Sequence, residues 1–114
     1  MQPKSLRWLE DIRSSADLIL QATAQRSPAD YEADALLRAA VERHFEIIGE
    51  VVGRLSRHDP DAARRLDDWP RIIAFRNVLI HGYDLVDHAQ VWQVLRHDLP
   101  RLNAQVAALL GEAD

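Results

Sequence analysis

The sequence predicts an all-α protein, a four- to five-helix up-and-down bundle, formed by one domain of residues 1–114. Three observations support this fold class. Apolar residues recur at three- and four-residue spacing along most of the chain, which is the period of one buried helix face. Turn and capping residues interrupt this pattern, and signals for strands are few. Hydrophobic residues make up 47% of the chain, enough for a core of its own.

The first two predicted helices each carry one apolar stripe. The first covers about Ser5–Gln25, with Leu6, Leu9, Ile12, Ala16 and Ile19 on one face. The segment RSPADYEAD then supplies turn and capping residues. The second covers about Tyr31–Arg57, with the stripe Leu37, Val41, His44, Ile48, Val51 and Leu55. We interpret His44 as a core or interface histidine. Gly49, in mid-helix, costs stability relative to alanine unless close packing uses it.

The last two predicted helices are separated by a glycine that ends one helix and an aspartate that begins the next. HDPDAARRLDDWP is an irregular connector, after which Pro70 suits the first position of a third helix that runs to His81. Gly82 fits its C-terminal cap. The fourth helix starts at Asp87, which resembles a capping box with Gln90, and its stripe is Trp92, Leu95, Leu99, Leu102, Val106 and Leu109. Pro100 predicts a kink in this helix rather than a break.

Composition excludes several classes of function. The net charge of −4 argues against broad, nonspecific binding of nucleic acid, although residues 54–83 hold six arginines against four aspartates, a local excess of two positive charges. The absence of cysteine excludes disulfides and thiolate metal sites. Without an apolar leader or a membrane-length stretch, we expect a soluble cytoplasmic protein. No glycine-rich phosphate loop is present, so we expect no nucleotide cofactor. The two His-Asp pairs, His58-Asp59 and His97-Asp98, lack the further ligands that a metal site needs.

Arg76 is unusual because it lies inside the apolar arc of the third helix, between Ile72 and Ile80 at about 100° per residue. A buried unpaired charge would cost several kcal/mol. In one interpretation, Arg76 forms a buried ion pair with Glu46 or Glu50 of the second helix. In the other, Arg76 and His81 line a groove in which an anionic substrate supplies the counter-charge. The helical wheel leaves both open and favours the structural pair, because such pairs outnumber active sites.

Arginine and histidine together suit cleavage of RNA. Arginine holds phosphate with a planar, bidentate fork, and histidine can accept or donate a proton near neutral pH. Cleavage needs a base for the ribose 2′-hydroxyl, an acid for the leaving oxygen and a cation for the phosphorane. Two chains meeting at this helix would supply two histidines and two arginines, without a metal.

The stretch Arg76-Asn77-Val78-Leu79-Ile80-His81 places a polar residue after an arginine and four residues between that arginine and a histidine. Gly82-Tyr83 extends it, and the stretches EIIGEVVGRLS (46–56) and WPRIIAFRNVLIHGYDLVDHAQVWQVLRHDLPRLNAQV (69–106) agree with the same pattern. By these residues the chain resembles the HepT-like branch of the HEPN superfamily, from Val41 onward. With the resemblance, the groove becomes the better interpretation of Arg76.

The resemblance implies a bundle of HEPN type that forms a homodimer with the two Arg…His motifs facing each other. It implies a metal-independent endoribonuclease, acting on RNA as the toxin of a toxin–antitoxin pair. Arg76 would bind or polarise the phosphate, His81 would be the acid or base, and Asn77 would orient them. Glu50 or Glu46 would help to hold the guanidinium.

The resemblance also implies a partner, a minimal nucleotidyltransferase (MNT), as the antitoxin. This enzyme would transfer AMP from ATP to Tyr83 and so block the groove. Two alternatives stay open. The chain could be a non-catalytic binding module, the substrate-binding subunit of such a nucleotidyltransferase. It could also be a structural helical dimer, in which Arg76→Ala would destabilise the fold strongly.

Overall fold

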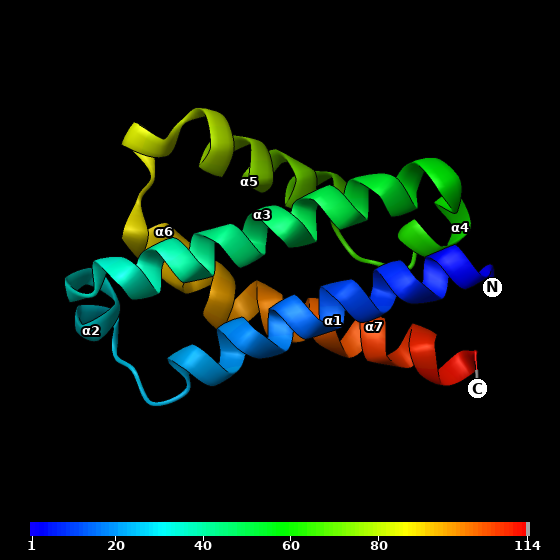
Figure 1. Cartoon of the computed structure of the whole chain (residues 1–114), viewed down its shortest axis with the longest axis horizontal. Helices are drawn as coiled ribbons and strands as arrows, with labels where there is room; N and C mark the ends of the chain where they lie inside the picture. Colours follow the sequence, from blue (N-terminus) through cyan, green and yellow to red (C-terminus); the bar gives the residue numbers. More distant parts are fainter. Residues whose placement is uncertain (114) are drawn as a thin grey trace.

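The computed structural model describes residues 1–113, and all secondary structure in that range is helical. The elements are α1 (Pro3–Thr23), α2 (Pro28–Ala33), α3 (Ala35–His58), α4 (Pro60–Ala63), α5 (Trp69–His81), a 3-10 turn (Tyr83–Leu85), α6 (His88–Gln93), a π-helical turn (Val94–Asp98) and α7 (Leu99–Glu112). The long helices α1, α3, α5 and α7 alternate in direction along the chain (Figure 1). The predicted all-α, up-and-down bundle is therefore confirmed.

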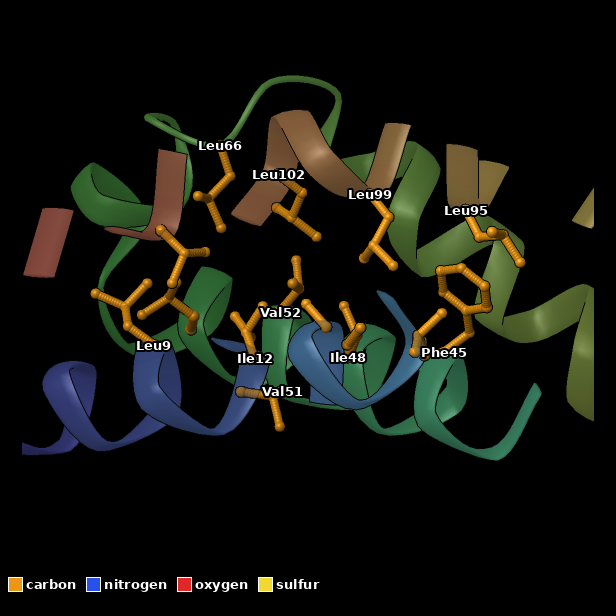
Figure 2. Close-up of a cluster of buried hydrophobic side chains, with 14 of the residues drawn as sticks. Leu9, Ile12, Phe45, Ile48, Val51, Val52, Leu66, Leu95, Leu99 and Leu102 are labelled. Atoms are coloured by element: carbon orange, nitrogen blue, oxygen red, sulfur yellow. The ribbon is translucent and has the colours of Figure 1, made fainter. Parts of the chain in front are cut away.

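The core lies between α1, α3 and α7. α1 packs against both α3 and α7, and α5 packs against α3 on the outer side (Figure 1). Figure 2 shows the central side chains converging from three helices: Leu9 and Ile12 from α1, Ile48 and Val52 from α3, and Leu99 and Leu102 from α7. All but Val52 lie on the stripes that the sequence predicts, because burial follows the helical period; Val52, next to the predicted Val51, is fully buried as well.

The predicted second helix is divided in two at Asp34. This residue is extended (φ −110°, ψ 94°), and its Oδ1 accepts a hydrogen bond from the Leu37 backbone N–H at 3.0 Å. An aspartate in that role is an N-cap, so α3 begins at Ala35 and not at Tyr31. Tyr31 belongs instead to α2, which starts with a capping box between Ser27 and Asp30.

The final helix continues past Pro100, as predicted, with a distortion just before it. Asp87 is the N-cap, and its Oδ1 accepts from the N–H groups of Ala89 (2.9 Å) and Gln90 (3.3 Å). The side chain of Gln90 makes no reciprocal bond within the described range, so the cap is not a full capping box. The π turn at Val94–Asp98 widens the helix where Pro100 cannot donate a hydrogen bond.

α5 is the least covered of the long helices. Leu79 is its only buried residue, although apolar residues lie on several sides of the helix. Phe75 meets Phe45 of α3 edge-on, with ring centroids 5.3 Å apart. Val78 keeps 50% of its surface exposed. The Arg…His motif is therefore carried by a helix that the bundle holds from one side.

Candidate functional site

The close approach of α5 to α3 depends on Gly49. A Cβ atom at this position would lie 2.3 Å from Cβ and 2.7 Å from Cγ of Arg76, and 3.4 Å from the carbonyl oxygen of Ile72. Real side chains do not tolerate the first two distances. The mid-helix glycine therefore has the packing role that would offset its low helix propensity. It allows the root of the Arg76 side chain to lie directly on the backbone of α3.

The Arg76 guanidinium has no carboxylate partner within residues 1–113. Glu50 pairs with Arg54 at 3.0 Å, and Glu46 lies 3.8 Å from Arg43, so neither forms the expected ion pair with Arg76. Arg76 is half-buried, and its Nε atom is covered without a hydrogen-bond acceptor. Buried donors without an acceptor are rare in folded proteins. The buried ion pair, our first interpretation of Arg76, is thus not formed.

Asn77 connects Arg76 to the edge of the helix that carries His81. Arg76 Nη1 donates a hydrogen bond to Asn77 Oδ1 at 3.0 Å. Asn77 and His81 are four residues apart, so they lie about one helical turn apart on the same side. Arg76 and His81 themselves differ by about 140° around the helix. The bond to Asn77 therefore ties the guanidinium to a residue on the side of α5 that carries His81.

His81 and Tyr83 are exposed at the end of α5. The helix ends where the Gly82 N–H donates to the carbonyl oxygen of Val78 at 2.8 Å, so Gly82 is the predicted C-cap. Tyr83 begins the 3-10 turn and is 77% exposed. It is therefore not the packed aromatic that an isolated tyrosine would most often be. Both functional groups are open to solvent or to another molecule.

Two cavities flank α5. The first, about 290 Å³, lies towards α6 and α7 and has a largely apolar lining that includes Phe45, Phe75 and Leu99. The second, about 310 Å³, lies along α3 and is lined by Gly49, Glu50, Gly53, Arg54, Arg57, Ile73 and Arg76. We call the second cavity the basic groove. The sequence analysis did not identify Arg54 and Arg57 as site residues. The spacing that could have indicated them is present in the sequence: Arg54 follows Glu50 by four residues, and Arg57 follows Gly49 by eight.

The other candidate residues have structural roles. Ser15 Oγ lies 3.1 Å from His44 Nδ1, so His44 is hydrogen-bonded between α1 and α3 as the sequence suggested. Asp59 caps α4 through Ala62 N–H (3.2 Å) and accepts from Ser5 Oγ at 2.7 Å. No group of three or more His, Asp or Glu side chains suited to a metal ion occurs within residues 1–113. In the same range, no helix has both the length and the apolar character to cross a membrane.

Comparison with known proteins identifies the family. The model of the "Ribonuclease HepT-like" family matches residues 12–109, which include α5 and its motif. A "Probable ribonuclease HepT" of Thermococcus cleftensis is 32% identical over 105 residues, covering 90% of this chain and 92% of that protein. A protein of Methanocaldococcus jannaschii, named as a candidate RNase, is 29% identical over 99 residues, with 87% and 90% covered.

A longer M. jannaschii protein is 29% identical over 107 residues. It is named for a gamma-glutamylcyclotransferase and a candidate RNase, and the match covers 94% of this chain but only 48% of that protein. No solved structure matches the chain significantly. The family match includes the segment in which Arg76, Asn77, His81 and Tyr83 lie. Because it covers most of the chain, the chain belongs to the ribonuclease HepT-like family.

Proposed function

We propose that this chain is a metal-independent endoribonuclease, the toxin of a toxin–antitoxin pair. One observation carries the proposal. The Arg76 guanidinium has no carboxylate partner in the described residues and is bonded to Asn77 beside the exposed His81. A cation held in this way lacks a counter-charge, which the phosphate of a substrate supplies. The names of the T. cleftensis and M. jannaschii relatives support the same reaction.

In the proposed reaction, a histidine accepts the proton of the ribose 2′-hydroxyl. The 2′-oxygen attacks the neighbouring phosphorus, and the bond from phosphorus to the 5′-oxygen breaks. A protonated histidine donates its proton to that leaving oxygen. The products are a 2′,3′-cyclic phosphate and a 5′-hydroxyl. Arg76 offsets the negative charge that builds up on the phosphorane, and Asn77 fixes the direction of the guanidinium.

The reaction needs an acid and a base, and the motif has one histidine, so we propose a homodimer built around α5. The one-sided packing of α5 supports this. Val78 is 50% exposed, and Ala74 is exposed beside it. A helix that is apolar on several sides is usually covered. At about 100° per residue His81 lies on the same side of α5 as Ala74 and Val78, so a second copy on this face would bring the two His81 side chains together.

We further propose that a minimal nucleotidyltransferase inhibits the toxin through Tyr83. The phenolic oxygen would attack the α-phosphorus of ATP, forming tyrosyl-AMP and releasing pyrophosphate. The 77% exposure of Tyr83 supports such access. Because Tyr83 lies two residues after His81, the added phosphate and nucleoside would compete with RNA for the site by charge and by volume.

The test is expression of the native chain alone in growing cells, beside Arg76→Ala, His81→Ala, Tyr83→Phe and the control Arg71→Ala. Arg71 lies on α5 but is 80% exposed and outside the motif. We expect growth arrest and RNA fragmentation with the native chain, Tyr83→Phe and the control. Arg76→Ala and His81→Ala should relieve both. Intact RNA in every strain, with all proteins folded, would contradict the nuclease and favour a non-catalytic binding module for the nucleotidyltransferase.

A further inference from the structure

The basic groove extends the site along α3, away from His81. Its floor is formed by Gly49, on which the root of the Arg76 side chain lies, and by Gly53, beside which Arg57 lies. Its walls are Arg54 and Arg57 of α3 and Ile73 and Arg76 of α5. The four-residue spacing of the glycines places them on one side of the helix, about 6 Å apart along its axis. The groove therefore has room beyond the position of Arg76.

The groove carries more positive than negative charge. Three arginines and one glutamate line it, and that glutamate, Glu50, is bound by Arg54 at 3.0 Å. No carboxylate within residues 1–113 pairs with Arg57 or Arg76. This local charge contrasts with the net charge of −4 on the whole chain. An anion would thus find two arginines without a carboxylate partner in the lining of one groove.

Arg57 is directed over this floor. A Cβ atom on Gly53 would lie 3.5 Å from Arg57 Nη1, which places the guanidinium beside Gly53. At Gly49 the Cβ and Cγ atoms of Arg76 lie on the helix backbone, while its guanidinium is bonded to Asn77 Oδ1. The two arginines therefore contact α3 at positions about one helical turn apart. A single phosphate held by the bidentate fork of one arginine leaves the other free for a neighbouring phosphate of the same strand.

We propose that the basic groove is a phosphate-binding subsite for the RNA strand, with Arg57 as its principal donor. The identification of the ligand as RNA rests on the proposed function. The subsite binds a phosphate next to the one that is cleaved, and so gives a chain of net negative charge a local surface for a polyanion. Arg54 contributes less, because Glu50 neutralises it. The subsite positions substrate and takes no part in proton transfer.

The experiment measures binding of a single-stranded hexanucleotide in which every 2′-hydroxyl is methylated, so that it cannot be cleaved. Fluorescence anisotropy of the labelled probe gives Kd at several salt concentrations. Arg57→Gln is compared with Arg71→Gln, which removes the same charge from an exposed position outside the groove. Arg57 is itself exposed, so its replacement leaves the core intact.

We expect Arg57→Gln to weaken binding by about tenfold, as loss of one charge-assisted contact does. The slope of log K against log salt should become shallower by about 0.7, the value for one phosphate contact on a single strand. Arg71→Gln should stay within about twofold of the native chain. Glu50→Gln should tighten binding, because it removes a negative charge and frees Arg54.

Equal affinities and slopes for Arg57→Gln and Arg71→Gln would overturn the subsite, as would a native chain that does not bind the probe. If the native chain does not bind the probe and the Arg57→Gln substitution abolishes its self-association, the groove is a protein interface. Cleavage of unmodified RNA separates the two proposals. A native chain that cleaves RNA, with Arg57→Gln indistinguishable from it in binding, keeps the nuclease and rejects the subsite. Probe binding that depends on Arg57, without cleavage, keeps the subsite and rejects the nuclease.

Discussion

Replacing Gly49 with alanine tests the contact on which the site is built. The new Cβ would lie 2.3 Å from Cβ of Arg76, against an optimum of about 3.5–4.0 Å between carbon atoms. Both atoms are fixed to their helix backbones, so α5 must move away from α3. Overpacking of this kind costs about 1–3 kcal/mol. A clash between two backbone-fixed atoms falls in the upper half of this range, about 2–3 kcal/mol. The higher helix propensity of alanine returns about 1 kcal/mol, which leaves a net loss of about 1–2 kcal/mol.

Gly53→Ala is the matched control, four residues further along the same helix. Its Cβ would meet Arg57 Nη1 at 3.5 Å and Ile73 Cδ1 at 3.9 Å, both ordinary contacts with the ends of side chains. The gain in helix propensity should then dominate, and we expect stabilisation of about 0.5–1 kcal/mol. The two variants should therefore differ by about 1.5–3 kcal/mol although their chemical change is the same.

Thermal unfolding, followed by circular dichroism at one protein concentration, measures this difference. An unfolding entropy of about 2.1 cal/mol/K per residue converts 1 kcal/mol into roughly 4 °C for a chain of this length. We expect Gly49→Ala to melt about 10 °C below Gly53→Ala. Cleavage of RNA should fall in Gly49→Ala, because Arg76 moves with α5. A Gly49→Ala protein that melts at or above the native temperature would refute the close contact.

Three further predictions concern single side chains. Arg76→Ala should reduce the free energy of unfolding by less than about 1 kcal/mol, because it breaks no ion pair. Leu79→Ala removes a side chain that is only 4% exposed and should reduce it by about 2–5 kcal/mol. Urea unfolding measures both. Equal losses would restore a structural role for Arg76. Burial raises the pKa of Glu42 above its ordinary value of 4.5, so the folded state holds that proton more tightly and loses stability as pH rises past 4.5. Glu42→Gln should therefore raise the free energy of unfolding at pH 7 and not at pH 4. A gain in stability of equal size at both pH values would contradict burial of the carboxylate as the cause. Tyr31→Phe should leave stability unchanged or raise it by about 1 kcal/mol, because the buried hydroxyl has no acceptor in the described residues; a loss above that size would disprove it.

The helices could be predicted because their signals are local. The apolar stripes, Asp87 as N-cap and Gly82 as C-cap depend on residues within one or two turns of each other. The division at Asp34 was missed for a similar local reason. An aspartate between two apolar stripes is compatible with a continuous helix, and the hydrogen bond that its side-chain Oδ1 accepts from the Leu37 N–H decides otherwise. The motif Arg76-Asn77…His81-Gly82-Tyr83 was equally readable, because its members are neighbours in the chain.

By itself, the sequence determined the fold class and the family resemblance, and it suggested Arg76, Asn77, His81 and Tyr83 as site residues. Only the tertiary structure decided what surrounds Arg76. Glu50 could have reached across to α5, but it pairs with Arg54 one turn away on its own helix. The bare backbone at Gly49 lets Arg76 lie on α3, and Arg57 lies over Gly53 to form a groove. These contacts depend on the rotation and register of two packed helices. Residue spacing within either helix does not specify them.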